Sequence, residues 1–201
     1  MAAAADRHAP GGALAAQDSD RPVRRGDSRR TVREAGGSAR LFLAIWPSGD
    51  EVAALDDYQR RWSWPAAAAR VRSERIHLTL HFIGTVPRPR LPEIGAGLAV
   101  GLAPCELALT RAAIWSRGLA VLLAPVVPGP LGELHTRLGE ALRTLGLPTE
   151  RRAFLPHVTL ARSAAGALPP EDPPALRWQV GCYALVETVA GGGYAIRQRY
   201  G

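Results

Sequence analysis

Short apolar runs alternate with amphipathic stretches over most of the chain. Residues Arg40-Leu-Phe-Leu-Ala-Ile-Trp46 form an apolar run of the length typical of a buried strand. Ser48 and Glu51 follow with the spacing of a helix capping box, and apolar residues then recur every three or four positions. This pattern predicts a helix over 49–62, and the next apolar run predicts a strand over 76–83.

The same order of elements returns in the second half of the chain. An apolar strand is predicted over 119–124, a helix along the leucine stripe of 131–145, and a strand over 156–162. The two units have nearly the same length, and both end in a strand that reads His-aliphatic-Thr-Leu. This repetition predicts two related lobes, each contributing one such strand.

The remaining pattern completes an α+β fold. A helix is expected over 87–100, a strand over 106–115, and a hairpin of the segments 176–188 and 194–200 that turns at the glycines 191–193. We therefore predict two pseudo-symmetric lobes of largely antiparallel sheet, with outer helices around a central cleft.

Residues 1–38 differ in composition from the rest. They consist mostly of Ala, Gly, Asp, Ser and Arg and cannot bury enough apolar surface to offset their ordering entropy. We expect a disordered extension, followed by a single domain over 39–201. The stretch lacks the apolar run of an export signal and is too acidic for a mitochondrial presequence. We expect the stretch to be either a dispensable extension or the result of a start codon assigned too far upstream.

Charge and cysteine content limit the expected partners and the expected cellular compartment. The net charge is +7 with an isoelectric point near 10.6, which favours an anionic partner such as RNA but says nothing of chemistry. The two cysteines are far apart and suggest neither a zinc site nor a disulfide framework. No apolar run approaches the roughly 20 residues of a membrane span. We expect a cytoplasmic monomer with no membrane segment and no obligate protein partner.

The candidate chemistry lies in His77-Leu-Thr-Leu-His-Phe82 and His157-Val-Thr-Leu-Ala-Arg162. In each strand, alternation puts the first His and the Thr on one face and the aliphatic residues on the other. Each His would lie about 6 to 7 Å along its strand from its Thr, a separation that can bracket a phosphate. The competing interpretation is two half-buried strands whose polar faces contain His and Thr by chance, which the repeated placement disfavours.

These paired motifs resemble those of the 2H phosphoesterases, and within them the bacterial RNA 2',3'-cyclic phosphodiesterases, also known as 2'-5' RNA ligases. The resemblance covers about 40–201 and includes Phe154-Leu-Pro-His-Val-Thr-Leu-Ala-Arg162 and the closing Gly193-Tyr194. The chain departs from the family at His81, where Lys is common. A Gly-x-Phe-Pro segment usual in the family is not recognisable around 112–117.

The resemblance implies hydrolysis of 2',3'-cyclic phosphates on RNA ends or nucleotides to 2'-phosphomonoesters, with no metal and no cofactor. His77 would donate a proton to the O3' leaving group, and His157 would accept one from water. Chemistry alone does not assign the two roles. Thr79, Thr159 and Arg162 would bind the phosphate.

The sequence leaves the roles of three residues open. Strict alternation places Arg162 away from the cleft, so its role requires the strand to end or twist after Ala161. His81, beyond Thr79 on the cleft side, is either a solvated edge residue or a substrate contact. Trp115 either packs between the lobes or stacks on a base.

Alternative functions use the same residues. One is a 2'-5' RNA ligase or 2'-5' phosphodiesterase acting at the same site. Another is a catalytically inactive RNA-binding module, which would not need two proton-transfer groups.

Overall fold

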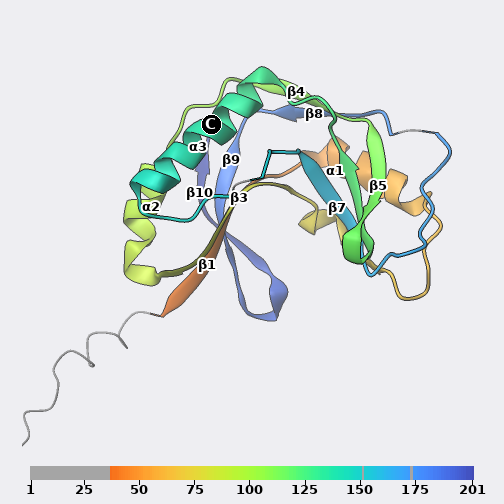
Figure 1. Ribbon diagram of the computed structural model, residues 1–201, viewed down its shortest axis with the longest axis horizontal. Coiled ribbons are helices and arrows are strands. Elements are labelled where there is room, and N and C mark those ends of the chain that lie inside the picture. The colour runs from red at the N-terminus through yellow and green to blue at the C-terminus, as the bar shows by residue number, and fades with distance from the viewer. Residues whose placement is uncertain (1–36, 151, 173) are drawn as a thin grey trace, which may run out of the picture. The chain divides into compact units, whose positions relative to one another are not determined.

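The two strands that carry the His-x-Thr motifs lie side by side in the middle of one antiparallel sheet (Figure 1). The structure, a computed structural model, describes residues 37–150, 152–172 and 174–201. The expected disordered extension thus lies outside the described residues except for its last two positions. The sheet order is β10-β9-β1-β3-β7-β6-β5, with β2 paired to the far part of β7. Its strands are β1 (Ser38–Ile45), β2 (Ala69–Arg70), β3 (Leu78–Pro87), β5 (Arg111–Trp115), β6 (Leu119–Leu123), β7 (His157–Arg162), β9 (Tyr183–Thr188) and β10 (Tyr194–Tyr200).

The sheet divides into two halves at the junction of β3 and β7. Strands β10, β9, β1 and β3 form the first half, and β7, β6, β5 and β2 form the second. The register between the halves contains one residue pair, Leu78 with Val158, so the sheet is narrowest where the two motifs meet. The α+β class and the largely antiparallel pairing predicted from the sequence are confirmed.

The helices form on the predicted amphipathic stretches. Helix α3 (Gly129–Thr144) packs against β3 and completely buries its four leucines, Leu131, Leu134, Leu138 and Leu142. Helix α1 (Gly49–Arg60) begins at the predicted capping box, where the Glu51 carboxylate accepts a hydrogen bond of 2.6 Å from the Ser48 N–H. The second Glu51 oxygen accepts the Gln179 N–H at 2.6 Å, which ties the start of α1 to a second, small sheet.

Two of the predicted strands are wrong, because each divides between the small sheet and the main sheet. The segment 106–115 is not one strand: β4 (Cys105–Leu109) pairs with β8 (Leu176–Val180), and β5 joins the main sheet. The change of sheet occurs at Thr110, whose N–H bonds to the Leu123 carbonyl at the start of the β5–β6 ladder. The segment 176–188 likewise divides into β8 and β9. The breaks fall near Thr110-Arg111 and Gly181-Cys182, residues that the prediction had included within continuous strands.

The segment 87–100 also forms less helix than predicted. A single 3-10 turn η2 (Arg88–Arg90) leads into the short helix α2 (Leu91–Gly97). Pro89 and Pro92 lack an N–H and restrict the residues before them, which limits regular helix here. The predicted hairpin of β9 and β10 is confirmed, and it turns through η4 (Ala190–Gly192), where two glycines have positive φ.

Candidate active site

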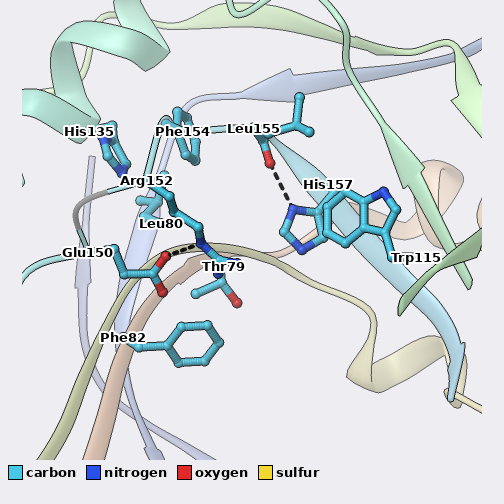
Figure 2. Close-up of a pocket in the computed structure, with 10 residues that line it drawn as sticks. All are labelled: Thr79, Leu80, Phe82, Trp115, His135, Glu150, Arg152, Phe154, Leu155 and His157. Carbon is cyan, nitrogen blue, oxygen red and sulfur yellow. Dashed lines mark hydrogen bonds and ion pairs between the residues drawn. The ribbon is translucent and has the colours of Figure 1, made fainter. Parts of the chain in front are cut away.

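A pocket lies over the junction of the two halves, and it collects the residues of both motifs. It is lined by His77, Thr79, His157, Thr159 and Arg162 together with neighbouring basic and aromatic side chains. The two His and the two Thr are half-buried. A smaller apolar pocket adjoins it at Thr79 and His157 (Figure 2).

The register of the junction fixes how the four polar residues alternate. Because Leu78 pairs with Val158 in an antiparallel ladder, His77 faces Thr159 and Thr79 faces His157. The two histidines therefore occupy diagonal positions, which in such a ladder are about 7–8 Å apart. A tetrahedral phosphate placed between them would meet one imidazole on each side and one threonine hydroxyl beside each imidazole.

Both imidazoles are oriented by the same backbone contact. His77 Nδ1 lies 2.8 Å from the Arg75 carbonyl oxygen, and His157 Nδ1 lies 2.8 Å from the Leu155 carbonyl oxygen. A carbonyl only accepts hydrogen bonds, so in each ring Nδ1–H is the donor. Nε2 is left to exchange a proton, as a base when neutral and as an acid when charged. Figure 2 shows this contact for His157.

The surroundings of His77 favour its neutral form. Burial lowers its pKa below the ordinary 6.5, and the hydrogen bond to the Arg75 carbonyl opposes that effect. The positive charges of Arg75, Arg162 and His157 lower the pKa further.

The surroundings of His157 differ by one carboxylate. Burial again lowers the pKa, and the hydrogen bond to the Leu155 carbonyl again opposes it. Arg152 lowers the pKa, whereas Glu150 raises it. These two side chains form an ion pair with Nε to Oε2 at 2.6 Å at the edge of the smaller pocket (Figure 2). With both pKa values lowered, both histidines are mainly neutral at pH 7, and an anionic ligand between them would favour protonation of one.

A tryptophan packs against each histidine. Trp46, just after β1, stacks on His77 with ring centroids 4.9 Å apart. Trp115, at the end of β5, lies 4.5 Å from His157 at an interplanar angle of 56°. Trp115 is half-buried and lines both pockets, so it both packs on His157 and presents surface to a ligand.

A β-bulge in β3 overturns the expected position of His81. The ladder with β1 passes from the pair Leu43 and His81 to the pair Ala44 and Thr79, so Leu80 is an extra residue. Alternation shifts after it, and His81 turns away from the cleft, is 3% exposed, and lines neither pocket. It is therefore neither a solvated edge residue nor positioned to contact substrate.

His81 instead packs under α3. Its Nε2 lies 2.9 Å from the His135 carbonyl oxygen, and its ring stacks on the His135 ring with centroids 4.1 Å apart. The same shift brings Phe82, assigned by strict alternation to the core face, into the cleft, where it is 51% exposed and lines both pockets. Figure 2 shows its ring beyond Thr79.

The second motif contains the same bulge, and it answers the question about Arg162. The ladder of β6 and β7 passes from the pair Ala120 and Ala161 to the pair Val121 and Thr159, which leaves Leu160 as the extra residue. Leu160 and Ala161 are both buried, and Arg162 returns to the side of Thr159, where it lines the larger pocket. The twist that a phosphate contact requires is thus a bulge at the equivalent position of each motif.

Several pocket residues were not predicted. Arg40, Arg75 and Arg152 add positive charge, and Phe42 and Tyr194 add aromatic surface. Arg75 and Arg152 precede the two histidines by two and five residues, a weak signal in a chain with 25 basic residues. No group of three or more His, Cys, Asp or Glu side chains that could hold a metal ion occurs within 37–150, 152–172 and 174–201. In the same ranges, no helix is both long and apolar enough to cross a membrane.

Comparison with known proteins identifies the family. A family model described as "2'-5' RNA ligase superfamily" matches residues 50–187, which include both His-x-Thr strands. The chain belongs to this superfamily. This superfamily is also called the 2H phosphoesterases, and the antiparallel sheet described above is thus the fold of one of its members.

Among curated relatives of this superfamily member, two are named RNA 2',3'-cyclic phosphodiesterase. The protein from Geobacillus stearothermophilus is 34% identical over 113 residues, and that from Aeropyrum pernix is 34% identical over 103 residues. The alignments span 53% and 46% of this chain but only 36% and 55% of those two proteins.

Solved structures agree over a longer stretch. E. coli LigT in apo form superposes with a TM-score of 0.72 at 25% identity, covering 81% of this chain and 96% of that chain. The same protein complexed with 3'-AMP gives a TM-score of 0.70, also at 25% identity, over 81% of this chain and 97% of that chain. The fold of this superfamily member is therefore that of LigT over most of its described length.

Proposed function

We propose that the protein hydrolyses 2',3'-cyclic phosphodiesters on RNA ends or nucleotides to 2'-phosphomonoesters. The observation that carries the proposal is the diagonal placement of two half-buried imidazoles, each held through Nδ1 by a backbone carbonyl. Such a pair can flank one phosphorus atom and serve as acid and base. The names of the two aligned relatives and the LigT complex with 3'-AMP support a nucleotide substrate.

The proposed reaction is an in-line displacement at phosphorus. The Nε2 of His157 takes a proton from water as the water oxygen bonds to phosphorus. The bond from phosphorus to O3' breaks, and the Nε2 of His77 gives its proton to O3'. The net change is addition of one water, and the phosphate remains on O2'. The assignment of donor and acceptor follows the family resemblance.

The threonines and the arginine act on the charge that develops at phosphorus. Thr79 and Thr159 donate hydrogen bonds to the non-bridging oxygens from the same face as the histidines. Arg162 adds a fixed positive charge that the β7 bulge turns toward the pocket. We place the enzyme in the cytoplasm as a monomer, where its two free cysteines, Cys105 and Cys182, stay reduced.

Product analysis tests the proposal. The protein is incubated with 2',3'-cyclic mononucleotides and with oligonucleotides that end in 2',3'-cyclic phosphate, with and without excess EDTA. We expect 2'-phosphate products at the same rate in both conditions. Products carrying a 3'-phosphate, or activity that requires a divalent ion, would contradict the mechanism. Joined 2'-5' oligonucleotides would indicate a ligase, and binding without turnover would indicate an inactive module.

A further inference from the structure

Gln59 is a buried polar side chain in the last turn of α1 that takes no part in the proposed reaction. It is 4% exposed. Its Nε2 donates one hydrogen bond to the Val71 carbonyl and one to the Leu160 carbonyl, both at 2.9 Å. Both N–H groups of the amide are therefore used. The side chain connects three segments that are distant in sequence: α1, the stretch after β2, and β7.

The Leu160 carbonyl belongs to the extra residue of the β7 bulge. A bulge leaves its extra residue outside the regular ladder, so the backbone groups of that residue need other partners. On the side away from β6, the Leu160 oxygen accepts the Val71 N–H at 2.7 Å, in continuation of the β2–β7 ladder, and the Gln59 amide at 2.9 Å. Gln59 supplies one of these two bonds and also occupies the Val71 carbonyl.

The bulge decides which way Arg162 points. In a regular strand Arg162 would share the buried face of Leu160, because side chains alternate with a period of two. With the bulge it shares the pocket face of Thr159. Without the Gln59 amide, the buried Leu160 carbonyl of the bulge keeps only its bond from the Val71 N–H, and the part-buried Val71 carbonyl loses its Gln59 donor. We then expect the free-energy difference between the bulged β7 and a regular β7 without the bulge to become smaller.

We propose that Gln59 is a positioning residue for Arg162, which acts by holding the β7 bulge. Its effect on turnover rests on the proposed function, but its effect on anion binding does not. The substitution Gln59→Leu removes both donors at similar volume. Tyr58→Phe is the matched control, since the neighbouring Tyr58 hydroxyl is also buried but has no hydrogen-bond partner among the described residues.

The experiment measures the affinity for inorganic phosphate and the turnover of a 2',3'-cyclic nucleotide, in wild type and in an Arg162→Ala background. We expect Gln59→Leu to weaken phosphate binding and lower kcat by about tenfold each, the order of one lost charge-assisted contact. Tyr58→Phe should change neither. In the Arg162→Ala background Gln59→Leu should cost less than about twofold, because its effect passes through Arg162.

Two results would overturn the proposal. One is a folded Gln59→Leu protein with wild-type phosphate affinity, and the other is an equal loss in both backgrounds. If Gln59→Leu does not fold, Gln59→Asn, whose amide is one methylene shorter, takes its place. If both unfold, Gln59 supports the fold as a whole and the proposal is wrong. A wild-type protein that binds phosphate but does not hydrolyse the cyclic nucleotide refutes only the proposed function. The phosphate affinities of the variants then still test whether Gln59 positions Arg162.

Discussion

The pH dependence of catalysis should be displaced toward acid. The proposed mechanism needs one imidazole protonated and the other neutral, so kcat/KM follows a bell whose limbs report the two histidines of the free enzyme. The pKa values of His77 and His157 are both lowered from 6.5, first by burial and then by nearby positive charge. Both limbs should therefore have midpoints below 6.5, and the optimum should lie between them.

The expected size of the effect follows from the slope of the alkaline limb. Above the higher pKa, kcat/KM falls tenfold per pH unit. At pH 8, at least 1.5 units above that midpoint, it should be lower than the plateau by about thirtyfold or more. The assay is hydrolysis of a 2',3'-cyclic nucleotide at low substrate concentration from pH 4.5 to 9. The cyclic phosphodiester stays singly ionised over this range, so the limbs belong to the enzyme.

Two substitutions assign the limbs. Arg75→Gln removes a positive charge near His77 while keeping the backbone carbonyl that binds Nδ1, so it should raise the His77 pKa. Glu150→Gln removes the carboxylate that raises the His157 pKa, so it should lower that pKa. The limb that moves upward in the first variant therefore belongs to His77, and the limb that moves downward in the second belongs to His157. Arg177→Gln, which removes an arginine paired with Glu106 on the β4–β8 sheet, is the charge control. Either of two results would refute the reasoning: an alkaline midpoint at or above pH 6.5 in the wild type, or limb midpoints that are unchanged in both Arg75→Gln and Glu150→Gln.

Three further predictions concern the pocket and its support. Thr79→Ala and Thr159→Ala should each lower kcat by about tenfold to a hundredfold, because neighbouring donors partly replace one lost hydrogen bond; unchanged kcat in either would remove that threonine from the site. His81→Leu should leave turnover and KM within about twofold, since His81 lines neither pocket, and a KM raised tenfold in a folded protein would contradict its placement. The free energy of unfolding, from urea titration, should fall as pH drops below 6.5, because the unfolded chain then binds more protons than the folded one. The responsible groups, all with lowered pKa, are His77, His81, His157 and His135, the last with its pKa lowered to about 4; stability that is constant or rises toward pH 5 would contradict their burial as neutral rings.

The sequence was sufficient for the elements that have a strong period. The helix of 131–145 and the two His-x-Thr strands were predicted to within a few residues, because a leucine stripe and an alternating strand each fit one structure only. Their repetition predicted the two halves and the shared pocket. The roles assigned to His77, Thr79, His157 and Thr159 remain predictions.

The sequence could not place residues that depend on the bulges. A bulge is a change of register between two strands, and single-strand alternation contains no information about the partner. The wrong placement of His81, the uncertainty at Arg162 and the unpredicted exposure of Phe82 therefore have one cause. The strand breaks at Thr110 and between β8 and β9 have a different cause. They depend on which of the two sheets each segment pairs with, and the local sequence pattern does not contain that information.

The central claim is that the two motif histidines act on one phosphorus atom, and it is tested most directly by turnover of a 2',3'-cyclic nucleotide by His157→Ala. The folded state of the variant is verified by circular dichroism and melting temperature. A single positioned acid or base is worth about two orders of magnitude or more, so kcat should fall by at least about a hundredfold, and adding His77→Ala should lower it little further. A folded His157→Ala protein with near wild-type turnover would contradict the account.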